Sequence, residues 1–592
     1  MTEIRNVAAD LARFRRRVLV IALAVLFAFG LLASRLVFLQ VVRHEDLAEQ
    51  AESNRTAVVP VVPNRGLILD RNGIVLASNY SAYTLEITPS KAGDVEDTID
   101  GLSEVVDISP RDRRRFKRLR EDSRSFDSVP IRTRLTDEEV ARFAAQRYRF
   151  PGVEIKARLF RNYPNGETAS HVLGYIGRIN QREKEAMEDW EEEDQANYKG
   201  TDYIGKLGVE QSYEKPLHGH TGVEQMETSA GGRAVRRLAS HPATPGNTVM
   251  LAVDIKLQKL IEDMYGDRRG AVVVIDPKTG EVLAFVSKPT FDPNLFVEGI
   301  DTESWKELSE SIDKPLLNRA LRGTYPPGST YKPFMALAAL QTGKRAANVS
   351  VLDPGYFNFG GHRFGSPEGY LGNVDMRRSI QVSSNIYYYS LANEMGVDMI
   401  HDAMKPLGFG QITGIDIGGE VRGVLPSTEW KRNAYKRPEM KRWYAGETIS
   451  LGIGQGYNSF TMLQLAQATS IVAAGGIKHR PHLVLATRDT VTGETTLLPQ
   501  PPGEDLGIKP SNIAVIREGL ASVVTGGTAR GVFAGAGYAA AGKTGTAQAV
   551  GMAPNSKYNA KALEEHQRDH ALFMAFAPVN DPKIAIAVIV ET

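Results

Sequence analysis

The stretch YPPGSTYKP, residues 325–333, decides how the rest of this sequence is interpreted. Its Pro-Pro-Gly segment ends a loop and apolar residues at helical spacing follow, so we expect a helix to begin at Ser329. Residues three apart on a helix share one face, which makes Lys332 a neighbour of Ser329. A serine hydroxyl is a weak nucleophile, and a lysine can act as its base only if burial or a nearby cation lowers the lysine pKa. The helix N-terminus at Ser329 also favours developing negative charge.

A second triplet, Ser383-Ser384-Asn385, lies where a loop is expected to enter a helix. Taken alone, such a triplet is more often a helix N-cap, just as a lone serine–lysine pair is more often a cap beside a surface lysine. In a catalytic site, Ser383 would relay a proton between the lysine and a leaving group. Asn385 would hold a substrate amide.

A third motif, Lys543-Thr544-Gly545-Thr546, follows the second by roughly 160 residues, so only folding can unite them. Lys543 supplies a second cation that could lower the pKa of Lys332. Gly545 would let a substrate backbone approach a strand closely. The hydroxyls of Thr544 and Thr546 could bind a carboxylate.

The pattern around these motifs predicts an α+β domain. Strands come first, a mostly helical stretch follows at 317–474, and strands return at the end, which implies an antiparallel sheet closed by both ends of the domain. The chain stops at Thr592, directly after an apolar strand, and a buried sheet edge needs covering. We therefore expect that a C-terminal helix is missing. The predicted strands are 271–275, 281–287, 544–550, 572–577 and 584–590, and a helix is predicted at 255–265.

The N-terminal segment predicts a membrane anchor. Residues 18–34 carry no charge, and the apolar run resumes at 36–42 after Arg35. Four arginines lie just before it, so the positive-inside rule places residues 1–17 in the cytoplasm and the chain after residue 42 outside. A cleavable signal peptide is the alternative, because Ala33 and Ser34 resemble a cleavage site.

The interval 43–250 shows no catalytic cluster. Asn72-Gly73 between two apolar runs predicts a hairpin, and residues 205–222 predict a polar helix closed by glycines. The basic run 111–120 and the acidic run 188–194 are both typical of solvated faces. We assign 43–250 to a non-catalytic domain and 251–592 to the catalytic domain.

Composition excludes several classes of function. A length of 592 residues requires several domains. The net charge of +1 provides no overall field that would attract nucleic acid. There are no cysteines, so disulfides, zinc–thiolate sites and a cysteine nucleophile are all ruled out.

The three motifs in this order are those of β-lactamases and penicillin-binding proteins. Over nearly its whole length the sequence resembles the class B penicillin-binding proteins. The 383–396 and 425–432 segments are more similar to the elongation type, penicillin-binding protein 2, than to the division type. The segments that carry the resemblance are RGLILDRNG (65–73), GKLGVEQSYE (205–214), IDPKTGEVLAFVSKPTFDPN (275–294), YPPGSTYKP (325–333) and Gly454-Gln455-Gly456.

The resemblance implies a membrane-anchor helix, an elongated mixed pedestal domain of the dimerisation type, and a transpeptidase domain with a five-stranded antiparallel sheet flanked by helices. It implies a periplasmic D,D-transpeptidase that cross-links peptidoglycan stem peptides during elongation and is inhibited by β-lactams. Ser329 would attack the penultimate D-Ala with Lys332 as base, and the N–H groups of Ser329 and Thr546 would form the oxyanion hole. The implied partner is a polytopic glycosyltransferase of the RodA type.

The resemblance also bears on metals. Some relatives hold a metal between the first two motifs with the help of a cysteine. This chain has Asp353, His362 and Asp375 there but no cysteine, so we expect no metal and no cofactor.

Three alternatives remain open. Residues 537–544 fit the P-loop pattern of an ATPase, although that loop needs a buried strand before it and a helix after it. A division-type transpeptidase would share all three motifs. So would a non-catalytic β-lactam sensor on the same fold.

Overall fold

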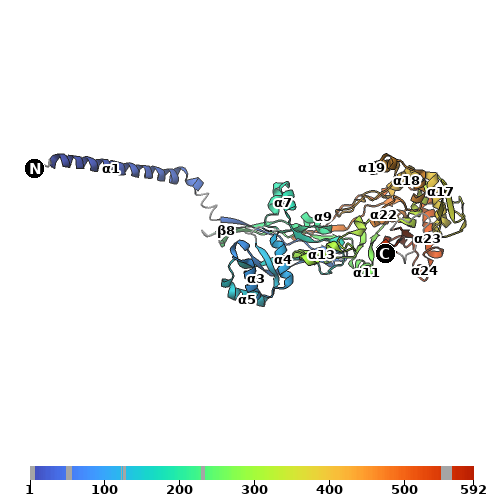
Figure 1. Ribbon diagram of the computed structural model, residues 1–592, viewed down its shortest axis with the longest axis horizontal. Helices are drawn as coiled ribbons and strands as arrows, with labels where there is room; N and C mark the ends of the chain where they lie inside the picture. Colours follow the sequence, from blue (N-terminus) through green and yellow to red (C-terminus); the bar gives the residue numbers. More distant parts are fainter. Residues whose placement is uncertain (1–6, 48–55, 122, 124–127, 229–233, 549–562) are drawn as a thin grey trace. The chain divides into compact units, whose positions relative to one another are not determined.

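The computed structural model describes residues 7–47, 56–121, 123, 128–228, 234–548 and 563–592. Figure 1 shows the ribbon coloured along the sequence. Contacts within the chain divide it into two units. The first contains 1–63, 192–200 and 220–244, and the second contains everything else. This division does not fall at residue 250, since most of the predicted pedestal belongs to the unit that holds the catalytic motifs.

The first unit contains the apolar N-terminal helix. α1 spans Val7–Val37 and continues as a π-helical turn, η1, at Phe38–Val42. Together they form the one helix in the described residues that is long and apolar enough to cross a membrane, and none of its apolar window is buried. The helix begins 11 residues before the predicted span, because the charged residues before Val18 are also helical. A single-pass anchor fits this segment.

The rest of the first unit is a small antiparallel sheet. Its strand order is β1-β8-β9, so the strand that follows the anchor pairs with a hairpin from much later in the chain. The bounds are β1 Thr56–Val61, β8 Gly222–Thr228 and β9 Ala234–His241, with the short helix α8 at Glu192–Asn197.

The second unit begins with a seven-stranded sheet of order β19-β18-β10-β2-β3-β4, in which β5 also pairs with β3. The predicted hairpin at Asn72-Gly73 is confirmed: β2 and β3 are antiparallel, and Gly73 has φ +82°, which suits glycine. The strands are β2 Ile68–Leu69, β3 Val75–Ile87, β4 Val129–Leu135, β5 Val153–Asn162, β10 Thr248–Leu251, β18 Val484–Arg488 and β19 Thr495–Leu497.

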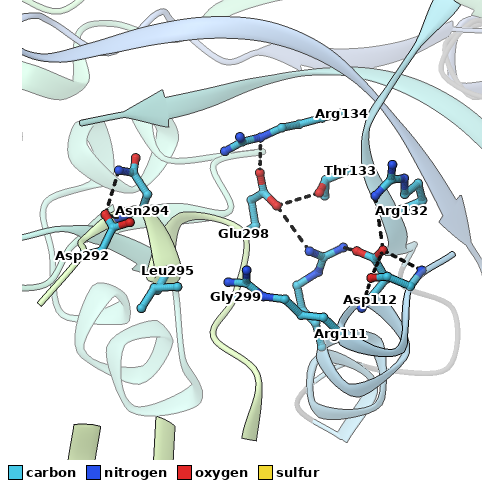
Figure 2. A pocket seen from close by; sticks show the side chains of 12 residues that line it. Arg111, Asp112, Arg132, Thr133, Arg134, Asp292, Asn294, Leu295, Glu298 and Gly299 are labelled. Carbon is cyan, nitrogen blue, oxygen red and sulfur yellow. Dashed lines mark hydrogen bonds and ion pairs between the residues drawn. The ribbon is translucent and has the colours of Figure 1, made fainter. Parts of the chain in front are cut away.

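Three helices pack on β3, β4 and β5 around an apolar core of their own. They are α3 Val95–Ser103, α4 Pro110–Glu121 and α5 Asp137–Gln146. The prediction that the basic run on α4 is fully solvated is wrong for Arg115, which is buried. Its guanidinium donates to Asp112 at 2.7 Å and to Glu298 at 3.3 Å, and Figure 2 shows Glu298 also bonded to Arg134 and Thr133. Carboxylate partners let this arginine leave the solvent.

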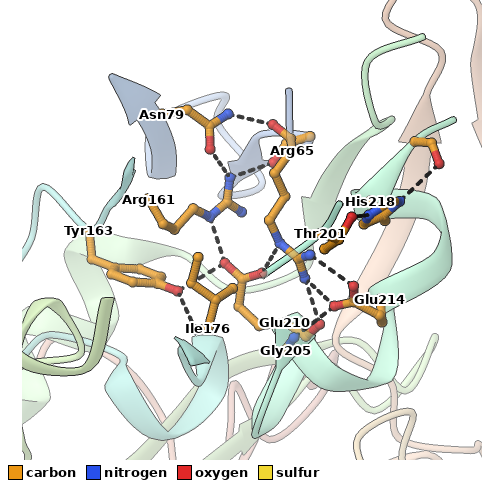
Figure 3. Close-up of polar contacts among 12 residues, drawn as sticks. Arg65, Asn79, Arg161, Tyr163, Ile176, Thr201, Gly205, Glu210, Glu214 and His218 are labelled. Carbon is orange, nitrogen blue, oxygen red and sulfur yellow. Dashed lines mark hydrogen bonds and ion pairs between the residues drawn. The ribbon is translucent and has the colours of Figure 1, made fainter. Parts of the chain in front are cut away.

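The predicted single polar helix at 205–222 is also wrong. Two short helices occupy it, α9 Gly208–Ser212 and α10 Glu214–His218. Glu210 on α9 is fully buried between Arg65 and Arg161, as Figure 3 shows. Neighbouring short elements are α6 Ser170–Leu173, β6 Ile176–Arg178, α7 Gln181–Glu188 and β7 Tyr203–Gly205.

The predicted five-stranded antiparallel sheet is confirmed, with the order β12-β11-β23-β22-β21. β23 lies in its centre, so the apolar terminal strand is not the sheet edge that we inferred from sequence. The predicted strand at 544–550 begins earlier, and its last two residues lie outside the described part of the chain. The strands are β11 Arg269–Ile275, β12 Val282–Lys288, β21 Ala541–Ala547, β22 His570–Ala577 and β23 Ile584–Glu591.

Helices cover both faces of this sheet. α11, at Ile255–Tyr265 as predicted, packs on the face formed by alternate residues such as Val272 and Val274. The opposite face, which includes Ala271 and Val273, packs on the main core with α15, α22 and α23. Those helices span Lys332–Gln341, Met462–Ala473 and Pro510–Gly526.

The helical insertion contains four strands that the sequence did not predict. They form two small antiparallel pairs, β13 Val351–Asp353 with β16 Gly372–Val374, and the hairpin β14 Tyr356–Phe359 with β15 His362–Gly365 between them in the chain. Before the insertion lie α12 Asn294–Val297 and α13 Thr302–Glu310. The other helices of the insertion are α14 Arg319–Arg322, α16 Met376–Gln381, α17 Asn385–Met395, α18 Val397–Met404, α19 Thr428–Ala434, α20 Pro438–Lys441 and α21 Ala445–Leu451.

Candidate active site

The first motif forms a tight turn rather than the start of an α-helix. Residues 328–331 are a 3-10 turn, η4, and α15 begins at Lys332 with a proline in its first turn. In a 3-10 turn, side chains three residues apart eclipse one another, so Ser329 and Lys332 lie on one side. Ser329 is half-buried whereas Lys332 is fully buried. The geometry therefore leaves the hydroxyl accessible and keeps the amine out of solvent.

The Lys332 ammonium is surrounded by neutral oxygens of the second motif. Its Nζ donates to the Ser383 carbonyl at 2.5 Å, to Ser383 Oγ at 3.1 Å and to Asn385 Oδ1 at 2.7 Å. Burial lowers the pKa of Lys332 to about 7, and the charges of Glu368 and Asp353 only partly oppose that shift. A lysine with this pKa is partly deprotonated at neutral pH and can accept a proton.

Ser383 is held in an unusual backbone conformation, with φ +60°. Its neighbour Ser384 caps α17 by accepting from Tyr387 N at 3.2 Å and donates its hydroxyl to buried Asp353 at 2.5 Å. The N-cap interpretation is therefore correct for Ser384. A left-handed non-glycine residue costs roughly 1–3 kcal/mol, and such strain persists only where the surroundings enforce it. Here it aims the Ser383 side chain at two lysines.

The third motif brings the second lysine to the same hydroxyl. Lys543 is fully buried in β21, and its Nζ donates to Ser383 Oγ at 3.0 Å and to the Thr544 carbonyl at 2.9 Å. Burial lowers the pKa of Lys543 well below its usual range, and the nearby charge of Lys332 lowers it further. Of the two causes considered from sequence, burial and a nearby cation, burial is the main cause of the lowered pKa of Lys332.

β21 is the edge strand of its sheet, which leaves one side of its backbone unpaired. The Thr546 carbonyl is bound from outside the sheet, by Gln455 Nε2 at 3.0 Å. Each residue of an antiparallel strand directs its N–H and its C=O to the same side, so the Thr546 N–H also points off the edge. A Cβ on Gly545 would lie 2.8 Å from a methyl carbon of Thr330, so this position requires glycine. The strand can therefore approach the nucleophile turn closely.

Folding thus unites the predicted residues of three distant motifs. Lys332, Ser383, Asn385 and Lys543 form one hydrogen-bonded cluster, and Ser329 lies three residues before Lys332. Asn385 binds the lysine through Oδ1, a role in addition to the substrate contact that we predicted. Of the two threonines predicted to bind a carboxylate, Thr544 forms a hydrogen bond between its Oγ1 and Oγ1 of Thr528 at 2.7 Å, and Thr546 is exposed.

The candidate metal residues have other partners. Asp353 accepts from Ser384, Asp375 caps α16 by accepting from Arg378 N at 2.8 Å, and His362 is exposed on β15. Across the described residues, no group of three or more metal-ligating side chains occurs. Sequence reasoning also missed Asp353 as the acceptor for Ser384, because no local pattern links a strand to a residue 31 positions later.

The P-loop alternative fails on context. A P-loop lysine lies in a loop that leads into a helix. Lys543 instead lies within β21, and the residues before and after it both pair with β22. The element that precedes β21 is the short helix α24 at Arg530–Phe533. The phosphate-cradling backbone is therefore absent at this position.

Comparison with known proteins gives consistent matches. A model of the penicillin-binding protein transpeptidase domain matches residues 270–592, and a model of the penicillin-binding protein dimerisation domain matches 60–251. The chain is 41% identical to the peptidoglycan D,D-transpeptidase MrdA of Escherichia coli K12, over 99% of this chain and 92% of that protein.

Solved structures are similar as well. Pseudomonas aeruginosa PBP2 in complex with WCK 5153 has 36% identity and a TM-score of 0.67, over 90% of this chain and 92% of that one. A second similar chain comes from the structure of a peptidoglycan synthase complex that coordinates polymerization and crosslinking. It has 28% identity and a TM-score of 0.66. That match covers 97% of this chain and 94% of the other.

Proposed function

The chain belongs to the class B penicillin-binding proteins and is an elongation-type serine D,D-transpeptidase of peptidoglycan; from that premise we propose that Ser329 carries the acyl group and that the lysine cluster activates it. One observation carries this proposal. Lys332 is fully buried three residues after Ser329, and in the described part of the chain its ammonium donates hydrogen bonds only to neutral oxygens. It can therefore be neutral when the donor peptide binds.

In the acylation step, Ser329 Oγ attacks the carbonyl carbon of the penultimate D-Ala, and its proton passes to neutral Lys332 Nζ. The oxygen of the tetrahedral intermediate accepts hydrogen bonds from the N–H groups of Ser329 and Thr546, a type of stabilisation that is usually large. The C–N bond to the terminal D-Ala then breaks. Ser383 delivers the proton from Lys332 to the leaving amine, and the acyl group stays on Ser329 as an ester.

The second half-reaction reverses these roles. An amine of a neighbouring stem peptide attacks the ester carbonyl, loses a proton towards Lys332, and forms the cross-link as Ser329 recovers its proton. Lys543 holds Ser383 and supplies positive charge. Thr544 and Thr546 offer hydroxyls to the substrate carboxylate, and Gly545 leaves room for its backbone. β-lactams acylate the enzyme in the same way, but the ester persists.

The domain boundaries follow from the same proposal. Residues 1–17 form a cytoplasmic tail, 18–42 the span, 43–250 the pedestal and 251–592 the transpeptidase domain. The arginines before the span support a cytoplasmic N-terminus and a periplasmic catalytic domain.

The glycan-polymerising partner is proposed to be a polytopic glycosyltransferase of the RodA type. The dimerisation-domain match at 60–251 and the similarity to a synthase complex that coordinates polymerization and crosslinking support this. Purified chain supplied with lipid-linked precursor should form no glycan polymer until the partner is added. Polymer formed by the chain alone would refute the dependence.

The activity is tested with a fluorescent penicillin and a stem-peptide donor. We expect covalent labelling together with release of terminal D-Ala. Labelling without any D-Ala release would favour a non-catalytic sensor instead.

A further inference from the structure

The loop Gly454-Gln455-Gly456 is not used by the chemistry above, although it lies against the active site. It follows α21, and both of its glycines have positive φ, +73° and +74°. Its backbone therefore takes a path that other residues would adopt only with strain.

The loop contacts the nucleophile turn through its first residue. Gly328 N donates to the Gly454 carbonyl at 3.0 Å. A Cβ on Gly454 would lie 2.3 Å from the Gly328 carbonyl oxygen, and a Cβ on Gly328 would lie 2.2 Å from the Thr546 carbonyl oxygen. The backbones of Gly328, Gly454 and Thr546 thus approach one another so closely that no side chain fits at the two glycines. This point lies one residue before Ser329.

The loop contacts the edge strand through its second residue. Gln455 Nε2 donates to the Thr546 carbonyl at 3.0 Å, across the unpaired side of β21. The peptide groups on either side of Thr546 are oriented together, because each edge residue directs N–H and C=O the same way. Fixing the carbonyl therefore also restricts the direction of the Thr546 N–H.

The loop itself is anchored from behind. Buried Asn458 donates to the carbonyls of Leu451 and Gln455, both at 3.2 Å. Next to it, the Tyr457 hydroxyl donates to Glu447 at 3.0 Å, and Glu447 is paired with buried Lys431. Gln455 is thus presented from a fixed support, whereas the bond to Thr546 is itself exposed to solvent.

We propose that Gln455 is a positioning residue that sets the oxyanion hole by holding the Thr546 peptide at its distance from Ser329. The inference rests on the proposed function, since it assigns the Thr546 N–H to the oxyanion. A donor that is preorganised costs no reorientation in the transition state, whereas a free edge strand must be oriented during the reaction.

The test separates noncovalent binding from acylation. For Gln455→Met, which keeps the length but cannot donate, we expect the acylation rate constant for a penicillin to fall about ten- to a hundredfold while the dissociation constant stays unchanged. The loss is smaller than the ~10²–10³ that follows removal of a donor, because the N–H remains. Gln455→Glu should be slower still, since its carboxylate repels the Thr546 carbonyl.

Gln411→Met provides a matched control, because Gln411 Nε2 also donates to a backbone carbonyl, that of Gly410, at 2.9 Å. It should leave the acylation rate at the wild-type value. Thermal midpoints of both methionine variants should stay close to wild type, because each variant loses a single hydrogen bond, exposed for Gln455 and part-buried for Gln411, and one such bond contributes little net stability.

The outcomes are distinguishable. If wild type is acylated but Gln455→Met reacts at the same rate, or if only its dissociation constant changes, the inference is overturned and the proposed function stands. If wild type itself is not acylated at Ser329, the proposed function fails first.

Discussion

Two buried clusters of basic side chains differ in what accompanies the positive charge. In the cluster of Figure 3, Arg65 and Arg161 each donate to Glu210 at 2.7 Å. Burial opposes ionisation of Glu210, but the two arginines outweigh it and hold the pKa of the carboxyl below its usual range. Glu210 and the neighbouring Glu214 raise the pKa of Arg65 despite its burial. The charges of Arg65 and Glu210 are therefore fixed.

In the catalytic cluster, every acceptor that the described residues place at hydrogen-bond distance from the two lysines is neutral. Lys332 and Lys543 share the Ser383 hydroxyl and otherwise bind an amide oxygen and two backbone carbonyls. Burial then lowers both pKa values, that of Lys332 to about 7. The comparison teaches that burial alone does not decide the charge of a side chain. A paired carboxylate keeps a buried basic side chain protonated. Without one, burial lowers the pKa of that side chain towards neutral pH.

Removing the nucleophile should have the largest effect. Ser329→Ala deletes one half-buried hydroxyl, so both buried clusters should remain intact and the protein should fold normally. We expect complete loss of the covalent penicillin adduct, measured by mass spectrometry of the intact protein. An adduct that persists in this variant would show that another residue is acylated.

Removing each catalytic lysine tests whether the two act differently. Lys332→Ala should lose ~10²–10⁴-fold in acylation rate, as expected for loss of a general base. Lys543→Ala should lose less, because Lys543 acts through charge and through its bond to Ser383. The rates are measured by stopped-flow labelling, with circular dichroism as the folding control. A Lys332 variant as fast as wild type would contradict the assignment of the base.

Breaking the paired cluster should affect stability instead of chemistry. Glu210→Gln removes the carboxylate that pairs with fully buried Arg161, whereas Arg65 keeps its ion pair with Glu214 at 2.6 Å. Removing one partner of a buried ion pair typically costs about 3–5 kcal/mol. Chemical denaturation should show a free energy of unfolding that is lower by that amount, while the folded fraction of the variant should be acylated at the wild-type rate. In wild type the contribution of Glu210 is present above its unfolded pKa and is lost as the pH falls through its lowered folded pKa. An unchanged denaturation midpoint would contradict the fixed-charge description.

The pH dependence of acylation should report the titratable cluster. The pKa of Lys332 is lowered to about 7, so the amine is protonated below that pH and neutral above it. The acylation rate should therefore rise through pH 7 and fall about tenfold for each unit below it. The Gln411→Met control should give the same profile. A rate that is constant from pH 5 to 8, or that rises only near the ordinary lysine pKa, would contradict the prediction.

Much of the architecture could be predicted from local sequence. Asn72-Gly73 identifies its hairpin because only a few residue types adopt the required turn, and helix 255–265 was predicted to the residue. The four strands between 351 and 374 escaped prediction, because they are short and half-exposed and carry no clear alternation. The burial of Arg115 escaped prediction for another reason, since one of its two carboxylate partners, Glu298, is 183 residues away, and only Asp112 is local.

The sequence by itself determined the chemistry available: a serine and lysine three residues apart, two further polar motifs, an apolar anchor and no cysteine. These depend on residue identity and short spacing, which local geometry converts directly into neighbours. Only the tertiary structure decided that Lys332 is buried against Ser383, that the Ser383 hydroxyl accepts hydrogen bonds from two lysines, and that Gln455 donates to the Thr546 carbonyl. Those contacts span 51, 160 and 91 residues. Their distances and the resulting pKa shifts arise from the packing of the whole domain, because desolvation depends on every atom that excludes water.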